Sequence, residues 1–303
     1  MLRTFQHKHL TWIDLENPTE AEVRAVAEEY RLHPTVAEEL MIPTPKPRVE
    51  LYKDYIYLIL HFPAWRHSHR TKSQEVDFVV GHDFIITTHY EVVDPIHKFS
   101  KVFEVNSILQ QSEIGEHAGF VFFYMVQKLY KGLIHELDYI ADALRHMEDK
   151  IYTGKEREMV RRLSEVGREL LSFKQSLAPH GDILESFAAA ARTLFGTNFE
   201  YYSTTIRGQY QRVLNIVENH REGLAELRET NNGLLSTKQN EIIQELTVVA
   251  SIFLPLALIT QIFGMSTTNI PLLDRPDGFW VVISLLATVG IITYAFFKYR
   301  KFL

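Results

Sequence analysis

The pattern of apolar and polar positions changes character along the chain, and its first part predicts a mixed α/β domain. Up to about residue 115, short runs rich in Tyr, Ile, Val and Phe are bounded by Pro, Gly or Asp, which is typical of strands. Between them, Asn17 followed by Pro18 and, three residues on, Glu20 predicts the start of a helix. We therefore expect an α/β domain over residues 1–116, with strands at Thr11–Leu15, Leu51–Phe62, Val76–Val80 and Phe84–His89.

From Gly119 onward the strand pattern disappears and a helical pattern replaces it. Pro179 is the only proline between Pro95 and Pro255, so long helices can run without interruption. We predict helices near 117–150, 156–192 and 199–263. The part before the apolar tail, residues 117–245, is then a helical region that ends in a stalk.

The third of these helices carries a coiled-coil-like seam. At roughly 1.5 Å per residue it would be about 100 Å long. Its apolar positions alternate steps of four and three, with one turn skipped at His220, and the seam runs without a proline into the first apolar run. Helices of this kind need partners, so we expect an oligomer. The seam consists of Ile206, Tyr210, Val213, Val217, Leu224, Leu227 and Leu234.

Two apolar runs at the C-terminal end predict a membrane domain over residues 246–303. Leu246–Phe263 and Gly278–Phe297 carry no charged residue. Each run is close to the roughly 20 residues that a bilayer requires. We predict two transmembrane helices, at about 246–263 and 279–297. The alternative, two buried helices of a large soluble core, is disfavoured because such helices rarely run this long without a charge. Aromatic residues cluster at the ends of the second run, as they do at membrane interfaces.

Charge is distributed unevenly and suggests both partners and orientation. The net charge of −6 comprises −8 on residues 1–245 and +2 on the tail. An acidic body argues against nucleic acid as a partner, because binding to phosphates requires a basic face, and suits cations better. The cationic C-terminus places that end in the cytoplasm by the positive-inside rule. With two spans, the N-terminal part is then also cytoplasmic, and we expect a multi-pass protein of the plasma (inner) membrane.

A polar stripe follows one face of the first span. Five of its seven positions are polar, and polar groups that faced lipid would be costly, so the face should look at another helix or at water. Packing between helices is one interpretation. The other is a symmetric pore lined by uncharged oxygens, with an apolar constriction at Leu254 and Leu258, that passes a hydrated cation such as Mg²⁺. The stripe consists of Asn240, Gln244, Thr247, Ser251, Leu254, Leu258 and Gln261.

Four segments, in order, carry a resemblance to a known family. They read WIDLENPTEAE (12–22), HPTVAEEL (33–40), RVELYKDYIYLILHFP (48–63) and NEIIQELTVVASIFLPLALITQIFGM (240–265), the last followed by TTNIP (267–271). Together they resemble the CorA magnesium transporters. The resemblance implies a homopentamer with a cytoplasmic funnel and a central pore built from the first span, and transport of Mg²⁺, often also of Co²⁺ or Ni²⁺. It places Asn240, Ile243, Thr247, Leu254 and Gly264 on the pore line.

The entrance motif departs from the family's Gly-Met-Asn and reads Gly264, Met265 and Ser266. In the family the Asn contacts the water shell of the incoming ion, and a serine hydroxyl is shorter and lacks the amide. One turn earlier, where a small residue is usual, the chain has Gln261. We predict that a ring of Gln261 amides, assisted by Ser266 and Asn269, takes over this contact; the alternative is that Gln261 bonds a neighbouring helix.

Regulation by cytoplasmic divalent ions is expected to be weak. The resemblance implies an acidic pair between neighbouring cytoplasmic domains, and Glu91 matches one side of it. The side on the long helix falls near Thr205 and Gly208 instead of a carboxylate. Divalent cations at protein sites usually depend on one or two carboxylates, so Glu91 alone should bind loosely.

Other classes of function remain as alternatives or are disfavoured. A CorA-like zinc transporter shares the architecture, and a membrane-anchored scaffold or sensor that has lost transport is a third interpretation. We expect no enzyme and no cofactor, because the sequence has no glycine-rich phosphate loop, no nucleophile elbow and no His-Glu-x-x-His pattern. The absence of cysteine excludes thiolate chemistry and disulfides. His67 and His69, two residues apart, are typical of a surface segment.

Overall fold

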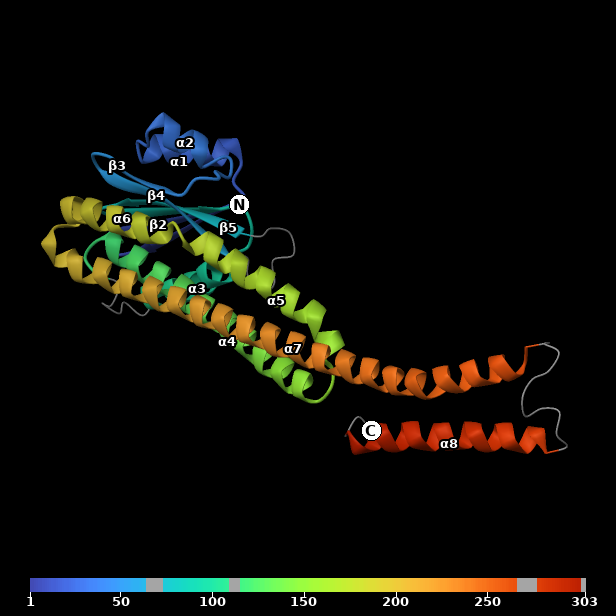
Figure 1. Ribbon diagram of the computed structural model, residues 1–303. Coiled ribbons are helices and arrows are strands. Elements are labelled where there is room, and N and C mark those ends of the chain that lie inside the picture. The colour runs from blue at the N-terminus through green and yellow to red at the C-terminus, as the bar shows by residue number, and fades with distance from the viewer. Residues whose placement is uncertain (64–72, 109–114, 266–276, 301–303) are drawn as a thin grey trace. The chain divides into compact units, whose positions relative to one another are not determined.

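The computed structural model describes residues 1–63, 73–108, 115–265 and 277–300. It contains two compact units, Met1–Arg228 and Glu229–Leu303, which are considered separately below. The first unit is built on a six-stranded sheet in the order β1-β2-β6-β5-β4-β3 (Figure 1). Only β2 and β6 pair in parallel; the other four pairs are antiparallel. The strands are β1 Leu2–His7, β2 Leu10–Glu16, β3 Arg48–Leu51, β4 Tyr55–Pro63, β5 Ser73–Gly81 and β6 Phe84–His89.

The sheet confirms three of the predicted strands, corrects the fourth and contains one strand that was not predicted. The single strand expected over Leu51–Phe62 is wrong: a tight turn, in which Tyr52 N–H donates to Tyr55 O at 2.9 Å, divides the run into the hairpin β3–β4. The prediction also missed β1. This strand lies at the sheet edge and is mostly exposed, so its sequence lacks the apolar run by which buried strands are recognised.

Two short helices, α1 Glu20–Glu29 and α2 Pro34–Glu39, cover one face of the sheet. The predicted cap of α1 was two residues too early. Thr19 is the N-cap: its hydroxyl accepts from Glu22 N–H at 3.3 Å, and the Glu22 carboxylate accepts from Thr19 N–H at 2.8 Å. Together these two bonds form a complete capping box. Asn17 instead adopts a positive φ of 43°, which suits a turn rather than a cap.

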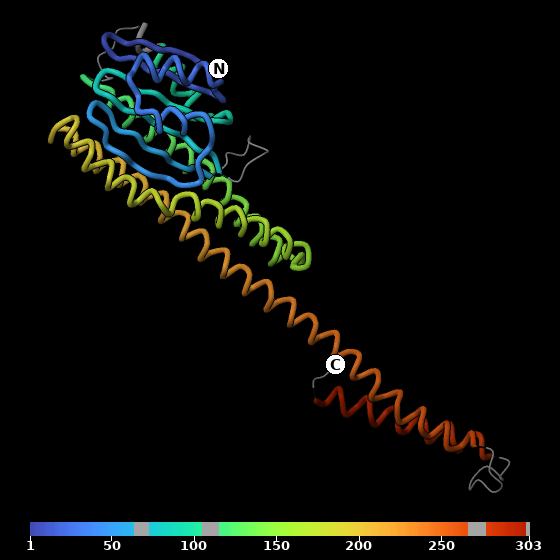
Figure 2. Tube along the Cα trace, turned by 90° about the horizontal axis from the view of Figure 1, so that it is seen from above, coloured from blue at the N-terminus to red at the C-terminus, as the bar shows by residue number. Residues whose placement is uncertain are grey.

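The helices α3 Asp94–Ile108, α4 Ala118–Tyr152, α5 Glu156–Leu177 and α6 His180–Phe195 cover the other face, as Figure 1 shows; Figure 2 looks down on the same layers from above. Aromatic contacts join these helices to the sheet. Trp12 of β2 lies 5.6 Å from Phe103 of α3, and Phe78 of β5 lies 5.2 Å from Phe122 of α4, measured between ring centroids. Such pairs add to the stabilisation from apolar burial. The unit is thus a three-layer α/β/α arrangement.

The predicted helix over 156–192 is two helices. Pro179 has no amide hydrogen to donate, so the chain turns between α5 and α6 at that residue. The third predicted helix is confirmed almost to the residue as α7 Glu200–Phe263, which has 64 residues. At roughly 1.5 Å per residue, α7 is about 96 Å long. A short 3₁₀ segment, Thr197–Phe199, precedes it. The last helix is α8 Gly278–Tyr299, which matches the second predicted span.

The first part of the α7 seam packs within its own chain. Ile206, Val213, Val217 and Leu224 are at most 3% exposed, and Tyr210 contacts the rings of α4 and α6 residues. This part of the seam therefore needs no partner subunit, contrary to the reasoning from sequence. An oligomer has to be argued from the second unit, Glu229–Leu303, instead.

His180 links the sheet to three helices. Its Nε2–H donates to the carbonyl of His61 on β4 at 2.9 Å, which leaves Nδ1 to accept from the Tyr130 hydroxyl on α4 at 2.8 Å. A neutral imidazole offers one donor and one acceptor in this way. The ring also packs against Tyr210 of α7. Burial lowers the pKa of His180 to about 4, so the ring is neutral in the folded protein.

We expect His180 to make the N-terminal unit sensitive to acid. An unfolded histidine takes up a proton below about pH 6.5, whereas folded His180 does so only near pH 4, so stability is lost as the pH falls through this window. The complete loss is about 3 kcal/mol. Thermal unfolding of the full chain should show a smaller acid-induced drop in midpoint for His180→Gln than for the parent.

His135→Gln serves as the matched control for this experiment, because the His135 side chain is 67% exposed. Its midpoint should follow that of the parent at every pH. Parallel curves for His180→Gln and the parent would contradict the assignment.

Candidate functional site

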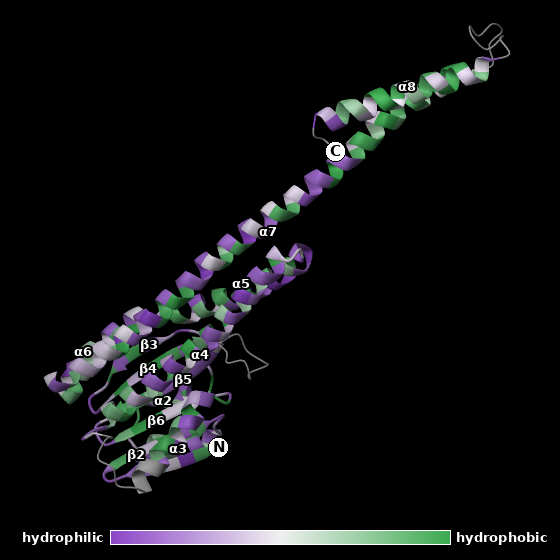
Figure 3. Ribbon diagram, turned by 90° about the horizontal axis from the view of Figure 1, so that it is seen from below, coloured by the Kyte–Doolittle hydropathy of each residue, from purple (hydrophilic) through white to green (hydrophobic). Residues whose placement is uncertain are grey.

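The second unit holds two apolar helical segments that the chain itself barely covers. In the most apolar window of α7, 6% of the residues are buried, and in that of α8 none are. Most of the ribbon of both segments is coloured as hydrophobic (Figure 3). Core helices of a soluble protein would be mostly buried, so this observation argues against that alternative and for helices surrounded by lipid.

One face of the apolar part of α7 packs on α8. Val248 is buried, and the half-buried positions recur at steps of three and four from Ile252 through Pro255 and Leu256 to Ile259. A Cβ atom at Gly290 of α8 would lie 3.9 Å from Leu256 Cδ1, so the two helices approach closely there. Small residues commonly allow such an approach between membrane helices.

The face turned away from α8 carries most of the predicted stripe. Since each residue turns a helix by about 100°, Leu254 and Gln261 lie nearly opposite the face that packs on α8. Leu254 and Leu258 are 70% and 59% exposed. Asn240, Ile243, Gln244, Thr247 and Gln261 are also exposed, whereas Ser251 is half-buried on the flank of the helix.

This face offers hydrogen-bond acceptors and no charge. The Thr247 hydroxyl donates to the Ile243 carbonyl at 2.7 Å, so its hydrogen is used within the helix and its oxygen lone pairs point outward. Such a bond to the preceding turn is common for threonine in a helix. Pro255 has no N–H, and the Ser251 carbonyl therefore lacks its helical donor. Oxygen acceptors of this kind suit water molecules around a cation, or a donor on a neighbouring helix.

The helix ends at the predicted entrance motif. Gly264 N–H donates to Thr260 O at 2.9 Å, and a Cβ atom at Gly264 would lie 3.1 Å from the same oxygen, which explains a residue without a side chain there. Met265 is 58% exposed. Ser266 and Asn269 lie outside the described residues, and their predicted part in ion recognition stays a prediction.

Glu91, the predicted regulatory residue, lies in the segment between β6 and α3. Gln74 donates to its carboxylate at 3.3 Å, and His89 donates to its backbone carbonyl at 2.6 Å. Burial disfavours the charged His89 ring, but the hydrogen bond and charge of Asp14, 3.2 Å away, outweigh this and raise the pKa of His89. Both effects act on the charged form of the ring, in opposite directions. The Glu91 backbone is therefore well anchored.

A divalent site at Glu91 stays a prediction. Thr205 uses its hydroxyl within α7, where it donates to Tyr201 O at 2.9 Å, and Gly208 is exposed on the same helix. Across the described parts of a single chain, no group of three or more His, Asp or Glu side chains is arranged to hold a metal ion. His67 and His69 lie outside those parts.

One polar cluster escaped the sequence reasoning. Glu75 and Asp77 are buried in β5 beneath α2. The sequence does place two acidic residues inside a mostly apolar strand, residues 74–80 (QEVDFVV). Nothing in that strand indicates which groups face the two carboxyls.

The two apolar helices, together with an N-terminal α/β unit from which α7 continues into the first apolar segment, define a membrane protein with two C-terminal spans. The model of the family described as CorA-like Mg²⁺ transporter protein matches residues 7–300, and the chain belongs to this family. Its members are transporters and not enzymes, in agreement with the expectation from sequence.

Curated relatives and a solved structure agree with this assignment. The cobalt/magnesium transport protein CorA of Thermotoga maritima is 23% identical over 97% of this chain and 83% of the relative. That of Methanocaldococcus jannaschii is 24% identical over 97% and 92%. The complete structure of the CorA magnesium transporter from Methanocaldococcus jannaschii superposes with a TM-score of 0.84 at 21% identity, covering 98% of this chain and 92% of that chain. This likeness confirms the predicted fold class.

Proposed function

We propose that the protein is a homopentameric channel for divalent cations, above all Mg²⁺ with Co²⁺ and Ni²⁺ as further ions, whose central pore is lined by the apolar part of α7. The observation that carries the proposal is the exposed face of α7 in a chain of the CorA family: uncharged oxygens at Asn240, Gln244 and Thr247, and leucines at Leu254 and Leu258. The relatives' names, which specify cobalt and magnesium transport, support the choice of ion.

Physical chemistry favours a hydrated ion on this path. Mg²⁺ releases its water reluctantly, so a pore face without carboxylates passes it most easily with its first shell in place. Amide and hydroxyl oxygens can accept hydrogen bonds from those waters without holding the ion too tightly. Rings of Leu254 and Leu258 would close the pore by excluding water between them.

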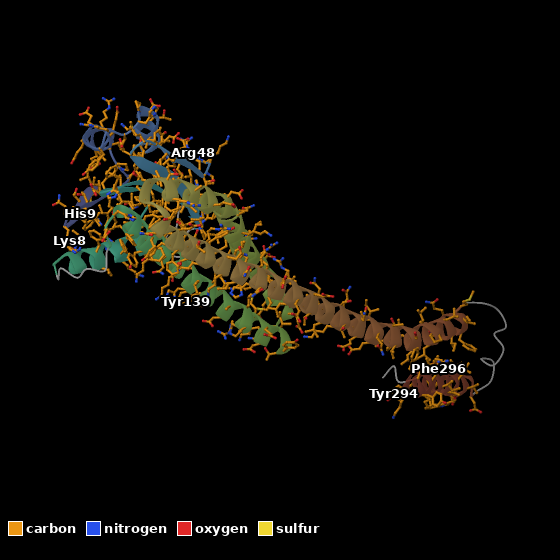
Figure 4. All side chains as sticks on the ribbon, turned by 90° about the vertical axis from the view of Figure 1, so that its left-hand side faces the viewer. Lys8, His9, Arg48, Tyr139, Tyr294 and Phe296 are labelled. Atoms are coloured by element: carbon orange, nitrogen blue, oxygen red, sulfur yellow. The ribbon has the colours of Figure 1, made fainter. Side chains whose placement is uncertain are left out.

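We propose that the protein spans the plasma (inner) membrane, with the N-terminal unit and the C-terminus in the cytoplasm. Lys298 and Arg300 follow the apolar part of α8, and the positive-inside rule assigns such an end to the cytoplasm. Tyr294 and Phe296, whose side chains extend from the α8 surface in Figure 4, are 49% and 56% exposed. Aromatic side chains of this kind suit the membrane interface.

The oligomer is expected to place α7 at its centre and α8 at its edge. The chain has no cysteine, so Leu258→Cys introduces a single thiol. A short bifunctional thiol cross-linker applied to this variant in lipid bilayers should join neighbouring subunits into covalent pairs, and native mass spectrometry of the solubilised oligomer should give five subunits of 35.3 kDa each. Leu285→Cys on α8 is the matched control and should give little product. An oligomer of fewer than five subunits, or covalent pairs that form through Leu285 instead, contradicts the arrangement.

Leu254 is expected to be part of the apolar constriction. Replacing it with Ser should hydrate the barrier and raise divalent leak several-fold in proteoliposomes, measured with Mg²⁺, Co²⁺, Ni²⁺ and Zn²⁺ in competition. The same change at Leu285 of α8 should leave the flux unchanged. Unaltered flux in a folded Leu254→Ser variant places the constriction elsewhere. A parent protein that moves none of the four ions supports the scaffold alternative, and a preference for Zn²⁺ supports the zinc transporter.

Gln261 is expected to contact the water shell of the incoming ion, as the Asn of the entrance motif does in the family. Gln261→Gly should abolish selective uptake, and adding Ser266→Asn should restore it, because an amide then returns to the entrance. Thr260→Gly is the control, since it weakens the helix by a similar amount, about 1 kcal/mol, one position away. If Gln261→Gly alone transports as well as the parent, Gln261 only bonds a neighbouring helix.

A further inference from the structure

A cluster of polar side chains is buried in the first unit, between the sheet and the segment that follows α2. Glu75 and Asp77 are two residues apart on β5, so both side chains point to the same face of the sheet. Asp77 is 0% exposed and Glu75 is 8% exposed. Arg48 of β3, labelled in Figure 4, contributes the guanidinium at the edge of the cluster.

The Glu75 carboxylate accepts hydrogen bonds from Thr44, in the segment between α2 and β3. Its carboxylate accepts from the backbone N–H of Thr44 at 2.8 Å and from the Thr44 hydroxyl at 3.2 Å. His61 Nε2 of β4 donates to the Thr44 carbonyl at 2.8 Å and lies 3.2 Å from the Glu75 carboxylate. These bonds tie the segment between α2 and β3 to the sheet.

The Asp77 carboxyl group has no such hydrogen-bond donors. Of the described residues, none donates a hydrogen bond to either of its carboxyl oxygens. The Tyr57 hydroxyl and the Thr88 hydroxyl, on the two strands that flank β5, are likewise buried without a hydrogen-bond partner among them. A buried ionised carboxylate without donors is very unfavourable.

The nearby cation, the Arg48 guanidinium, acts to lower the pKa of Asp77, but it is already paired with two other carboxylates. The Arg48 guanidinium bonds the Glu39 carboxylate of α2 and lies 3.4 Å from Glu50. His61 faces Glu75. The remaining groups that face Asp77 are Glu39 and the phenols of Tyr57 and Tyr90, none of which brings positive charge.

We propose that Glu75 and Asp77 form one buried proton-binding site, in which Asp77 is a neutral acid and donates its proton to the Glu75 carboxylate. The pair then carries a single negative charge, and the two donors of Thr44 stabilise that charge. Burial, and next the charge of Glu75, raise the pKa of Asp77 well above its usual range, which agrees with this geometry.

Loss of the shared proton would strain the contact between the sheet and the Thr44–Pro47 segment. Two neighbouring buried charges would repel, and the bonds from Thr44 to Glu75 are the part of the cluster best able to open. Pro45 and Pro47 of this segment, together with His61 and residues of α5, line a cavity of about 900 Å³, so the segment has open space beside it.

The pH dependence has a defined sign. A carboxyl whose folded pKa exceeds its unfolded pKa binds more protons in the folded state, so its contribution to stability falls as the pH rises from about 4 through the folded pKa. The N-terminal unit should therefore lose stability on the alkaline side because of Asp77.

Asp77→Asn tests the proposal, since an amide donates the same hydrogen bond to Glu75 and cannot ionise. Thermal unfolding of the full chain in detergent is measured from about pH 5 to pH 9. The midpoint of the variant should exceed that of the parent by several degrees at the alkaline end, and the difference should shrink toward pH 5. Asp54→Asn, in the exposed β3–β4 turn, is the matched control and should follow the parent.

Infrared spectroscopy gives a second readout that does not depend on the variant being stable. The parent at pH 7 should show the carbonyl-stretching band of a protonated carboxyl, and Asp54→Asn should retain it. Absence of this band in the parent, or its persistence in a folded Asp77→Asn variant, overturns the proposal. So does a rise in the parent's alkaline midpoint on addition of Mg²⁺ that Asp77→Asn lacks, because the pair would then hold a cation.

Discussion

A helix that crosses hydrocarbon must satisfy its backbone amides and carbonyls by itself, and this constraint governs the site of this protein. The apolar part of α7 meets it except at the Ser251 carbonyl, whose helical donor Pro255 removes, and the Thr247 and Thr260 hydroxyls also donate to carbonyls of their own helix. What remains for recognition is a small set of acceptors on the face turned away from α8. In the proposed pore, a face of amide and hydroxyl oxygens with leucines between them would contact a hydrated cation without replacing its water, so the proposed transport chemistry follows from what the membrane allows a helix to expose.

The first unit meets the opposite constraint, because its polar groups are buried in protein instead of lipid. His180 is satisfied as a neutral ring by one carbonyl and one phenol, and it joins β4 to α4 at the turn that Pro179 creates. Glu75 is satisfied as a carboxylate by Thr44, whereas Asp77 has no donor of its own among the described residues. The same interior thus holds a histidine whose pKa is lowered by burial and an acid whose pKa is raised by it. Both effects favour the neutral form, and they limit stability at opposite ends of the pH range.

Elements that depend on local patterns were predictable. The period of apolar positions places α7 within a few residues, because side chains three and four apart share a face whatever surrounds them. The length of an uncharged apolar run places α8 equally well. The same periodicity placed Leu254, Leu258 and Gln261 on one exposed face before any neighbour was known. The boundaries between elements were harder to predict from the sequence. The β3–β4 turn falls inside an apolar run, the α5–α6 turn depends on a single proline, and the edge strand β1 has too little buried surface to leave an apolar signature.

The sequence by itself determined the two apolar helices, the long helix that leads into the first of them and the polar stripe, since each is a property of consecutive residues on one element. Only the tertiary structure decided that the seam from Ile206 to Leu224 is covered by the chain's own helices, that Ser251 turns toward the flank of α7, and that Glu75 and Asp77 are enclosed under α2 with the nearby Arg48 already bonded to Glu39. The physical reason is that burial and charge balance depend on which distant segments meet. The spacing of residues along one strand or helix carries no information about those partners.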